Sequence, residues 1–203
     1  MTHYTLPDTA VTPDVSHLLP ILRRGDWGDG VEAVCAMSAL VAGAESADDC
    51  IAAGWSADVG ADWLPRLIVF LFDADVGADD EEAAAREWFV ALHGAVQGQA
   101  IDYRAARHRF LIGVLADGQH SALATLHSLD GDGAQQIAAI EAAVARHRRA
   151  LASDAPTDEE WDAAWVGARA AAWGAEAAAR AEHRSLLLTA LHQSTKQGDA
   201  RDV

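Results

Sequence analysis

Signals that begin α-helices recur along this chain, whereas no segment shows the apolar–polar alternation of a β-strand. Asp62 precedes Trp63-Leu64-Pro65, and an aspartate N-cap followed by a proline in the first turn favours a helix start. Asp102 has the same position before a helical pattern. Thr157 and Glu160 have the spacing of a capping box. The chain is therefore predicted to be all-α, an irregular multi-helix bundle of about 7–8 helices.

The predicted helices follow from apolar periodicity and from the breakers between the periodic segments. Helices are expected at residues 31–41, 46–54, 80–97, 102–116, 133–152 and 157–193 and after Asp62, and two short segments, 14–24 and 121–129, have weaker helical signals. Two of these helices have a clear apolar face. The residues are Tyr103, Ala106, Phe110 and Val114 in the first, and Ile137, Ile140, Val144 and Leu151 in the second. His147 lies on the second face, which favours a core or interface position over a catalytic one.

Four segments make up the predicted domain organisation. We expect an extended arm at residues 1–12, a helical domain at 13–153, a long Ala/Trp-rich helix at 154–193 and a flexible tail at 194–203. A straight helix from Thr157 to Gln193 would span roughly 55 Å. A compact domain of this length has a radius of gyration of about 17 Å. We therefore expect the last helix either to bend or to pack against a partner, which includes a second copy of the chain.

The formal net charge of the chain is −16 at pH 7. Nucleic acids and anionic membranes bind cationic surfaces, so we expect direct binding to neither. A basic protein partner suits this charge; the alternative is that the charge only keeps an alanine-rich chain soluble. The longest strongly apolar run, Leu67 to Phe72, is too short to span a membrane, and the N-terminus lacks the plan of a signal peptide. The prediction is a soluble, cytoplasmic protein.

The hexapeptide Ala-Asp-Val-Gly-Ala-Asp occurs at residues 57–62 and again at 74–79, and it suggests a cation-binding loop. An EF-hand frame that begins at Asp73 has Ala84 at position 12, where a bidentate carboxylate is required. We therefore interpret both copies as connectors whose last residues, Asp62 and Asp79, cap the helices that follow. The carboxylates around the second copy exceed what capping requires, and they form a candidate partner-binding surface. Its residues are Asp73, Asp75, Asp79, Asp80, Glu81 and Glu82.

Known catalytic signatures are missing from the sequence. It has no Gly-x-Ser-x-Gly elbow, no phosphate loop, no dinucleotide fingerprint and no Glu-x-x-His pair. Cys35 and Cys50 are too few for a disulfide scaffold, and we interpret them as small buried residues. We therefore assign no catalytic residue, no metal site and no cofactor.

Two arginine clusters stand out against the acidic background, one near residue 107 and one near residue 148. If the clusters meet in the fold, they can hold an anion or an acidic strip of a partner. The alternative is that they pair with carboxylates of the same chain. The candidate anion-binding residues are Arg104, Arg107, Arg146, Arg148 and Arg149.

The last predicted helix carries an aromatic face that is typical of binding hot spots, which favour tryptophan and arginine. The alternative is that these tryptophans anchor the helix on its own domain. The residues of this second candidate partner surface are Trp161, Trp165, Arg169 and Trp173.

Three hypotheses of function follow from these patterns. The leading one is a non-enzymatic, acidic helical protein that acts through protein–protein interaction, as an inhibitor or immunity-type protein that masks a basic surface. The second is an enzyme with an unrecognised helical Asp/His active site. The third is a structural subunit of a homo-oligomer that assembles through the C-terminal helix.

Overall fold

The computed structural model describes residues 15–16, 22, 35–41, 44, 46–55, 62–73, 79–97, 99–128, 134–152 and 177–195. Helices account for the regular structure of these residues, which contain isolated bridges such as Ile101 with Thr195 but no strand. The protein is all-α, as predicted. The chain divides into two compact units, residues 1–99 and residues 100–203.

In the first unit, helix α3 (Trp63–Asp73) is the central element. It packs against α1 (Ala36–Leu40), α2 (Ala47–Ala52) and α4 (Asp79–Val96). Its sequence is apolar on nearly every side, and such a helix is stable only when it is surrounded by other elements. The fully buried phenyl rings of Phe72 and Phe89 lie 5.5 Å apart and join α3 to α4.

Several helix ends in the first unit lie where the sequence places them. Ser46 Oγ accepts a hydrogen bond from Asp49 N at 3.2 Å and caps α2. The same helix stops before Gly54, whose φ of +72° suits a residue without a Cβ. Helix α3 begins at Trp63, directly after Asp62, as predicted. Helix α4 begins at Asp79 itself, one residue earlier than predicted, so Asp79 is the first residue of the helix and not the cap before it.

The two cysteines are free and buried, as predicted. Cys50 Sγ lies 3.6 Å from the carbonyl oxygen of Met37. Burial, together with the charge of Asp49, raises the pKa of the Cys50 thiol to about 12, so the group stays a neutral thiol at physiological pH.

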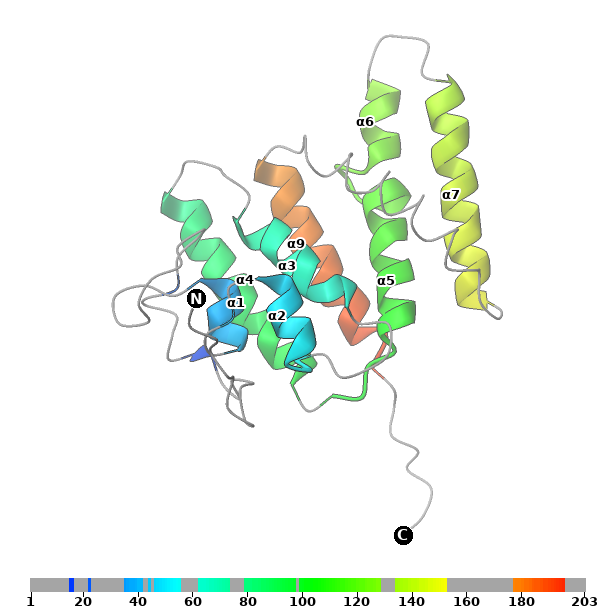
Figure 1. Ribbon diagram of the computed structural model, residues 1–203. Coiled ribbons are helices and arrows are strands. Elements are labelled where there is room, and N and C mark those ends of the chain that lie inside the picture. The colour runs from blue at the N-terminus through cyan, green and yellow to red at the C-terminus, as the bar shows by residue number, and fades with distance from the viewer. Residues whose placement is uncertain are drawn as a thin grey trace. The chain divides into compact units, whose positions relative to one another are not determined.

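In the second unit, helix α5 (Tyr103–Ile112) lies between α7 (Ala134–Ala152) and α9 (Ala177–His192), as Figure 1 shows. The helix continues as a π-helical turn, η2 (Gly113–Asp117), and α6 (Ala122–Ser128) follows. The predicted apolar face of α5 is buried, since Tyr103, Ala106, Phe110 and Val114 all belong to the core. On α7, Val144 and His147 are buried as expected, but Leu151 is exposed.

A tight contact joins the end of η2 to α9. A Cβ at Gly118 would lie 3.0 Å from the carbonyl oxygen of Gly113 and 3.2 Å from the carboxylate of Glu182. That carboxylate accepts hydrogen bonds from the backbone N–H groups of Gln119, at 2.5 Å, and of His120, at 2.7 Å. Glu182 therefore fixes the turn after η2 against α9.

Parts of the predicted organisation lie outside the described residues. These are the arm at 1–12, the helix at 14–24 except for single positions, residues 154–176 of the long C-terminal helix, and the tail at 194–203 except for Ser194 and Thr195. Helix α9 lies within the range predicted for that last helix, and it ends at His192, near the predicted Gln193. In the portion of the chain that the structure covers, no helix has both the length and the apolar character needed to cross a membrane.

Candidate anion site between two helices

Helices α5 and α7 pack against each other and bring the two arginine clusters of the sequence together. The helices run antiparallel, because the start of α5 lies beside the end of α7 and Ile112 of α5 packs near Val144 of α7. The residues midway between these points are His108 and His147. Their Nδ1 atoms lie 3.0 Å apart and their rings are tilted by 56°. One imidazole donates its Nδ1–H to the unprotonated Nδ1 of the other.

Both histidines are held in the neutral form. Only 1% of His108 and 4% of His147 are exposed. Burial lowers the pKa of His108 to about 3, and the nearby charge of Arg104 acts in the same direction. Burial likewise lowers the pKa of His147 to about 4, with Arg107 and Arg146 adding to the effect. At neutral pH the pair is an uncharged hydrogen-bonded link between the two helices.

The arginines of this region differ in whether they form an ion pair with a carboxylate. Arg148 forms an ion pair with Asp117 at 2.9 Å, and both side chains are exposed. Within the described residues, Arg104 and Arg146 form no hydrogen bond or ion pair through their side chains. Both are exposed, and Arg107 is half-buried beside the histidine pair. Among the described residues, no carboxylate therefore pairs with the positive charges of Arg104 and Arg146.

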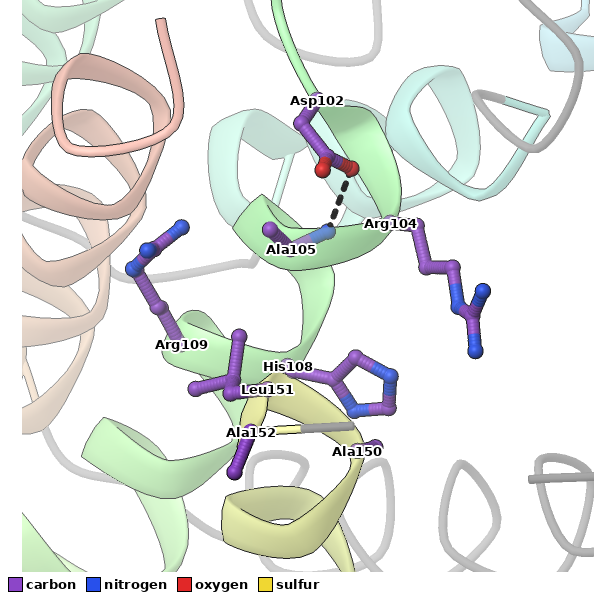
Figure 2. Close-up of a pocket in the computed structure, with 8 residues that line it drawn as sticks. All are labelled: Asp102, Arg104, Ala105, His108, Arg109, Ala150, Leu151 and Ala152. Atoms are coloured by element: carbon purple, nitrogen blue, oxygen red, sulfur yellow. Dashed lines mark hydrogen bonds between the residues drawn. The ribbon is translucent and has the colours of Figure 1, made fainter. Parts of the chain in front are cut away.

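A cavity of about 360 Å³ lies where the first two turns of α5 meet the last turn of α7. Figure 2 shows Arg104 and His108 on one side of Leu151, and Arg109 on the other. The eight lining residues are Asp102, Arg104, Ala105, His108, Arg109, Ala150, Leu151 and Ala152.

The local sequence explains why the cavity has this form. Asp102 Oδ1 accepts a hydrogen bond from Ala105 N at 2.9 Å, so the carboxylate caps α5, as predicted, and fixes the first turn. Arg109 donates from Nη1 to Ser194 Oγ at 2.5 Å. The backbone N–H of Asp102 also donates to the carbonyl oxygen of Ser194, at 2.8 Å. The residues that follow α9 thus hold both the cap and one guanidinium in place.

No family model matches the chain, and neither do any of the curated proteins or solved structures with which it was compared.

The structure describes only some of the other predicted site residues. Asp73, Asp79, Asp80, Glu81 and Glu82 belong to α3 and α4, at the two ends of the connection between these helices, and Glu82 is half-buried. Asp75 lies outside the described residues, as do Trp161, Trp165, Arg169 and Trp173. Both candidate partner surfaces therefore stay predictions. In the described part of the chain, no group of three or more His, Cys, Asp or Glu residues is placed to hold a metal ion.

Of the five candidate anion-binding residues, only Arg104 lines the cavity. Three other polar residues that line it were not candidates: Asp102, and the two further members of the first arginine cluster, His108 and Arg109. The sequence contains signals for each of them, because Asp102 was identified as an N-cap and the other two adjoin Arg107. What the sequence does not contain is the register of α7 on α5, which decides which turn of one helix faces which turn of the other.

Proposed function

We propose that this protein acts without catalysis, by binding a basic protein partner through the acidic surface of its first unit, as an inhibitor or immunity-type protein does. One observation carries the proposal: the charge is divided unevenly between the two units. Residues 1–99 contain 17 acidic residues and 4 arginines, whereas residues 100–203 contain 14 acidic and 11 basic residues. A surface with so large an excess of one sign attracts a partner of opposite sign and accelerates its association.

The acidic residues around the connection from α3 to α4 are the proposed centre of the contact. Asp79, Asp80, Glu81 and Glu82 are consecutive in the first turn of α4. Carboxylates in the first turn of a helix are favoured by the helix dipole, so the free protein tolerates four neighbouring acidic residues there. A basic partner would be attracted to these charges, and binding would weaken as the salt concentration rises.

Affinity capture from the native host tests this proposal with two matched variants. The first replaces Asp79, Asp80, Glu81 and Glu82 by lysine. The control replaces four acidic residues of the second unit by lysine, so that both variants have the same formal net charge. These residues are Asp158, Glu159, Glu160 and Asp162. We expect the first variant to lose a salt-sensitive basic partner that the wild type and the control both retain. Equal capture by all three proteins would refute the proposal that this acidic surface binds the partner.

A specific observation favours the enzyme hypothesis as a second candidate: Asp102 and His108 line the same cavity. An Asp/His site needs a carboxylate that orients the imidazole and an imidazole nitrogen that reaches a substrate. Asp102 instead uses Oδ1 to cap α5, and His108 uses Nδ1 in the link to His147. The interaction hypothesis is therefore the better supported of the two. Loss of a measured activity in Asp102→Asn, which keeps the cap, would reverse this order.

A further inference from the structure

The cavity between α5 and α7 presents two separate cationic groups rather than one. Arg104 and Arg109 are five residues apart on α5, which places them roughly 140° apart around the helix axis. Figure 2 accordingly shows the two guanidinium groups pointing to opposite sides, with Leu151 of α7 between them. Both arginines line the cavity.

Each guanidinium has donors to offer. Arg104 makes no side-chain hydrogen bond or ion pair with any of the described residues, and it is exposed. Arg109 is half-buried and uses one N–H in its bond to Ser194 Oγ, so most of its five N–H donors remain. That bond also restricts the side chain, which lowers the entropy lost when the guanidinium binds an anion.

Part of the cavity lining is apolar, although most of its surface is polar. The apolar part consists of Ala105 from α5 and Ala150, Leu151 and Ala152 from α7. Leu151 is 37% exposed and is the only large hydrophobic side chain exposed among the described residues. An aliphatic segment laid against it would remove this surface from water.

The local negative charges select the kind of anion. Asp102 lines the cavity, and α7 ends there with the negative end of its helix dipole. Both disfavour a compact dianion such as phosphate, whose charge is concentrated at one point. Two single charges held apart suffer less, because each lies at a planar guanidinium that matches a carboxylate with two parallel hydrogen bonds.

We propose that this cavity binds a linear dicarboxylate with a short aliphatic chain, with one carboxylate on Arg104, the other on Arg109 and the chain against Leu151. The cavity volume of about 360 Å³ lies at the lower end of the range of ligand pockets, roughly 300–1,000 Å³. The site lies wholly in the second unit, so this proposal and the acidic partner surface of the first unit are tested separately.

Calorimetric titration of the full chain with succinate, glutarate and adipate, at constant ionic strength, tests the proposal. Butyrate and inorganic phosphate serve as comparison ligands. We expect one dicarboxylate to bind at least tenfold more tightly than butyrate and than phosphate, because only a dicarboxylate engages both arginines. Absence of binding at millimolar concentrations, or equal binding of butyrate, overturns the proposal. Tighter binding of phosphate overturns it in favour of a simple anion site.

Charge variants then test the two contacts. Arg104→Gln and Arg109→Gln are each expected to weaken dicarboxylate binding at least tenfold. Arg148→Gln is the matched control, because it removes an arginine from the same helix pair whose charge Asp117 already neutralises. Asp102→Asn keeps an acceptor for the cap and removes a negative charge from the cavity, so it should tighten binding severalfold. An equal loss in Arg148→Gln and Arg104→Gln would mean that only net charge matters, and it would refute the site.

Arg109→Gln also breaks the hydrogen bond to Ser194. A second variant therefore distinguishes the loss of a direct contact between the guanidinium and the ligand from the loss of the hydrogen bond that positions the guanidinium. Ser194→Ala removes the same hydrogen bond and leaves the guanidinium in the cavity. Its affinity loss should be clearly smaller than that of Arg109→Gln. If the two losses are equal, the guanidinium makes no contact with the ligand and the proposed binding mode is wrong.

Discussion

His108 Nδ1 and His147 Nδ1 lie 3.0 Å apart and join α5 to α7 through a hydrogen bond between two neutral imidazoles. The bond requires one ring to donate and the other to accept. Protonation of the accepting ring at Nδ1 removes the acceptor and leaves two Nδ1–H donors facing each other. Protonation of the donating ring occurs at Nε2 and instead places a buried positive charge between the helices. The pair therefore makes the packing of α7 on α5 dependent on pH.

The first prediction is a loss of stability between pH 7 and pH 5. An unperturbed histidine titrates near pH 6.5, and the folded values are about 3 and about 4, so the unfolded chain binds protons in this interval while the folded chain does not. Stability is fully present above pH 6.5 and falls below it, by about 2 kcal/mol for each histidine at pH 5. Urea unfolding at several pH values measures the effect.

A variant without the two titrating groups isolates this contribution. His108→Asn combined with His147→Asn keeps a side-chain donor and acceptor near each position but does not titrate. The carboxylates and the other histidines are unchanged, so their effect on the pH dependence cancels in the comparison. The stability of the wild type should fall relative to that of the variant as the pH drops. If the free energies of unfolding of the wild type and the variant change in parallel with pH, the pair is not held neutral in the folded protein.

The second prediction concerns the cap of α5. Asp102→Ala removes the acceptor of the Ala105 N–H and should lower the free energy of unfolding by about 1 kcal/mol. Asp102→Asn should cost only a few tenths of that amount, because asparagine caps helices about as well as aspartate. Chemical unfolding followed by circular dichroism compares the two. An equal loss in both variants would mean that the negative charge, and not the cap, stabilises the helix.

Helix boundaries were predictable because they depend on neighbouring residues in the sequence. Ser46 and Asp102 cap the predicted helices, and the breakers Gly54 and Gly118 lie at helix ends. These signals act over three or four residues. The prediction was wrong for the helix at 31–41, because Cys35 is extended and α1 begins only at Ala36. The all-α class follows from the same local evidence.

The candidate site was less predictable because it depends on how one helix is aligned with another. Periodicity correctly assigned Val144 and His147 of α7 to a buried face, but it extended that face to Leu151, which is 37% exposed. Leu151 lies in the last turn of α7 and lines the cavity at the start of α5. A pattern within one helix contains no information on where its neighbour begins.

The third prediction compares two glycines of the second unit. Gly118→Ala places a Cβ 3.0 Å from the backbone carbonyl of Gly113, which cannot move without disturbing η2, and we expect a loss of roughly 1–3 kcal/mol. Gly113→Ala meets the Cδ2 methyl of Leu186 at 2.9 Å, a flexible and half-buried side chain. Alanine also has a higher helix propensity than glycine, so this variant should be close to neutral. Thermal unfolding measures both, and a larger loss at Gly113 would contradict the argument.

The fourth prediction concerns Glu182, whose carboxylate accepts the backbone N–H groups of Gln119 and His120. Hydrogen bonds to a charged acceptor are worth about 1.5–3 kcal/mol each when they are shielded from water, and the half-exposed position of Glu182 reduces this value. Glu182→Ala should release the turn after η2, so the amide hydrogens of Gln119 and His120 should exchange with solvent at least tenfold faster. Glu182→Gln keeps one carbonyl oxygen as acceptor and should show an intermediate rate. Because α5 has its own cap at Asp102, the exchange of its amides should change little in either variant. Faster exchange along the whole of α5 would instead show that Glu182 holds the entire unit together.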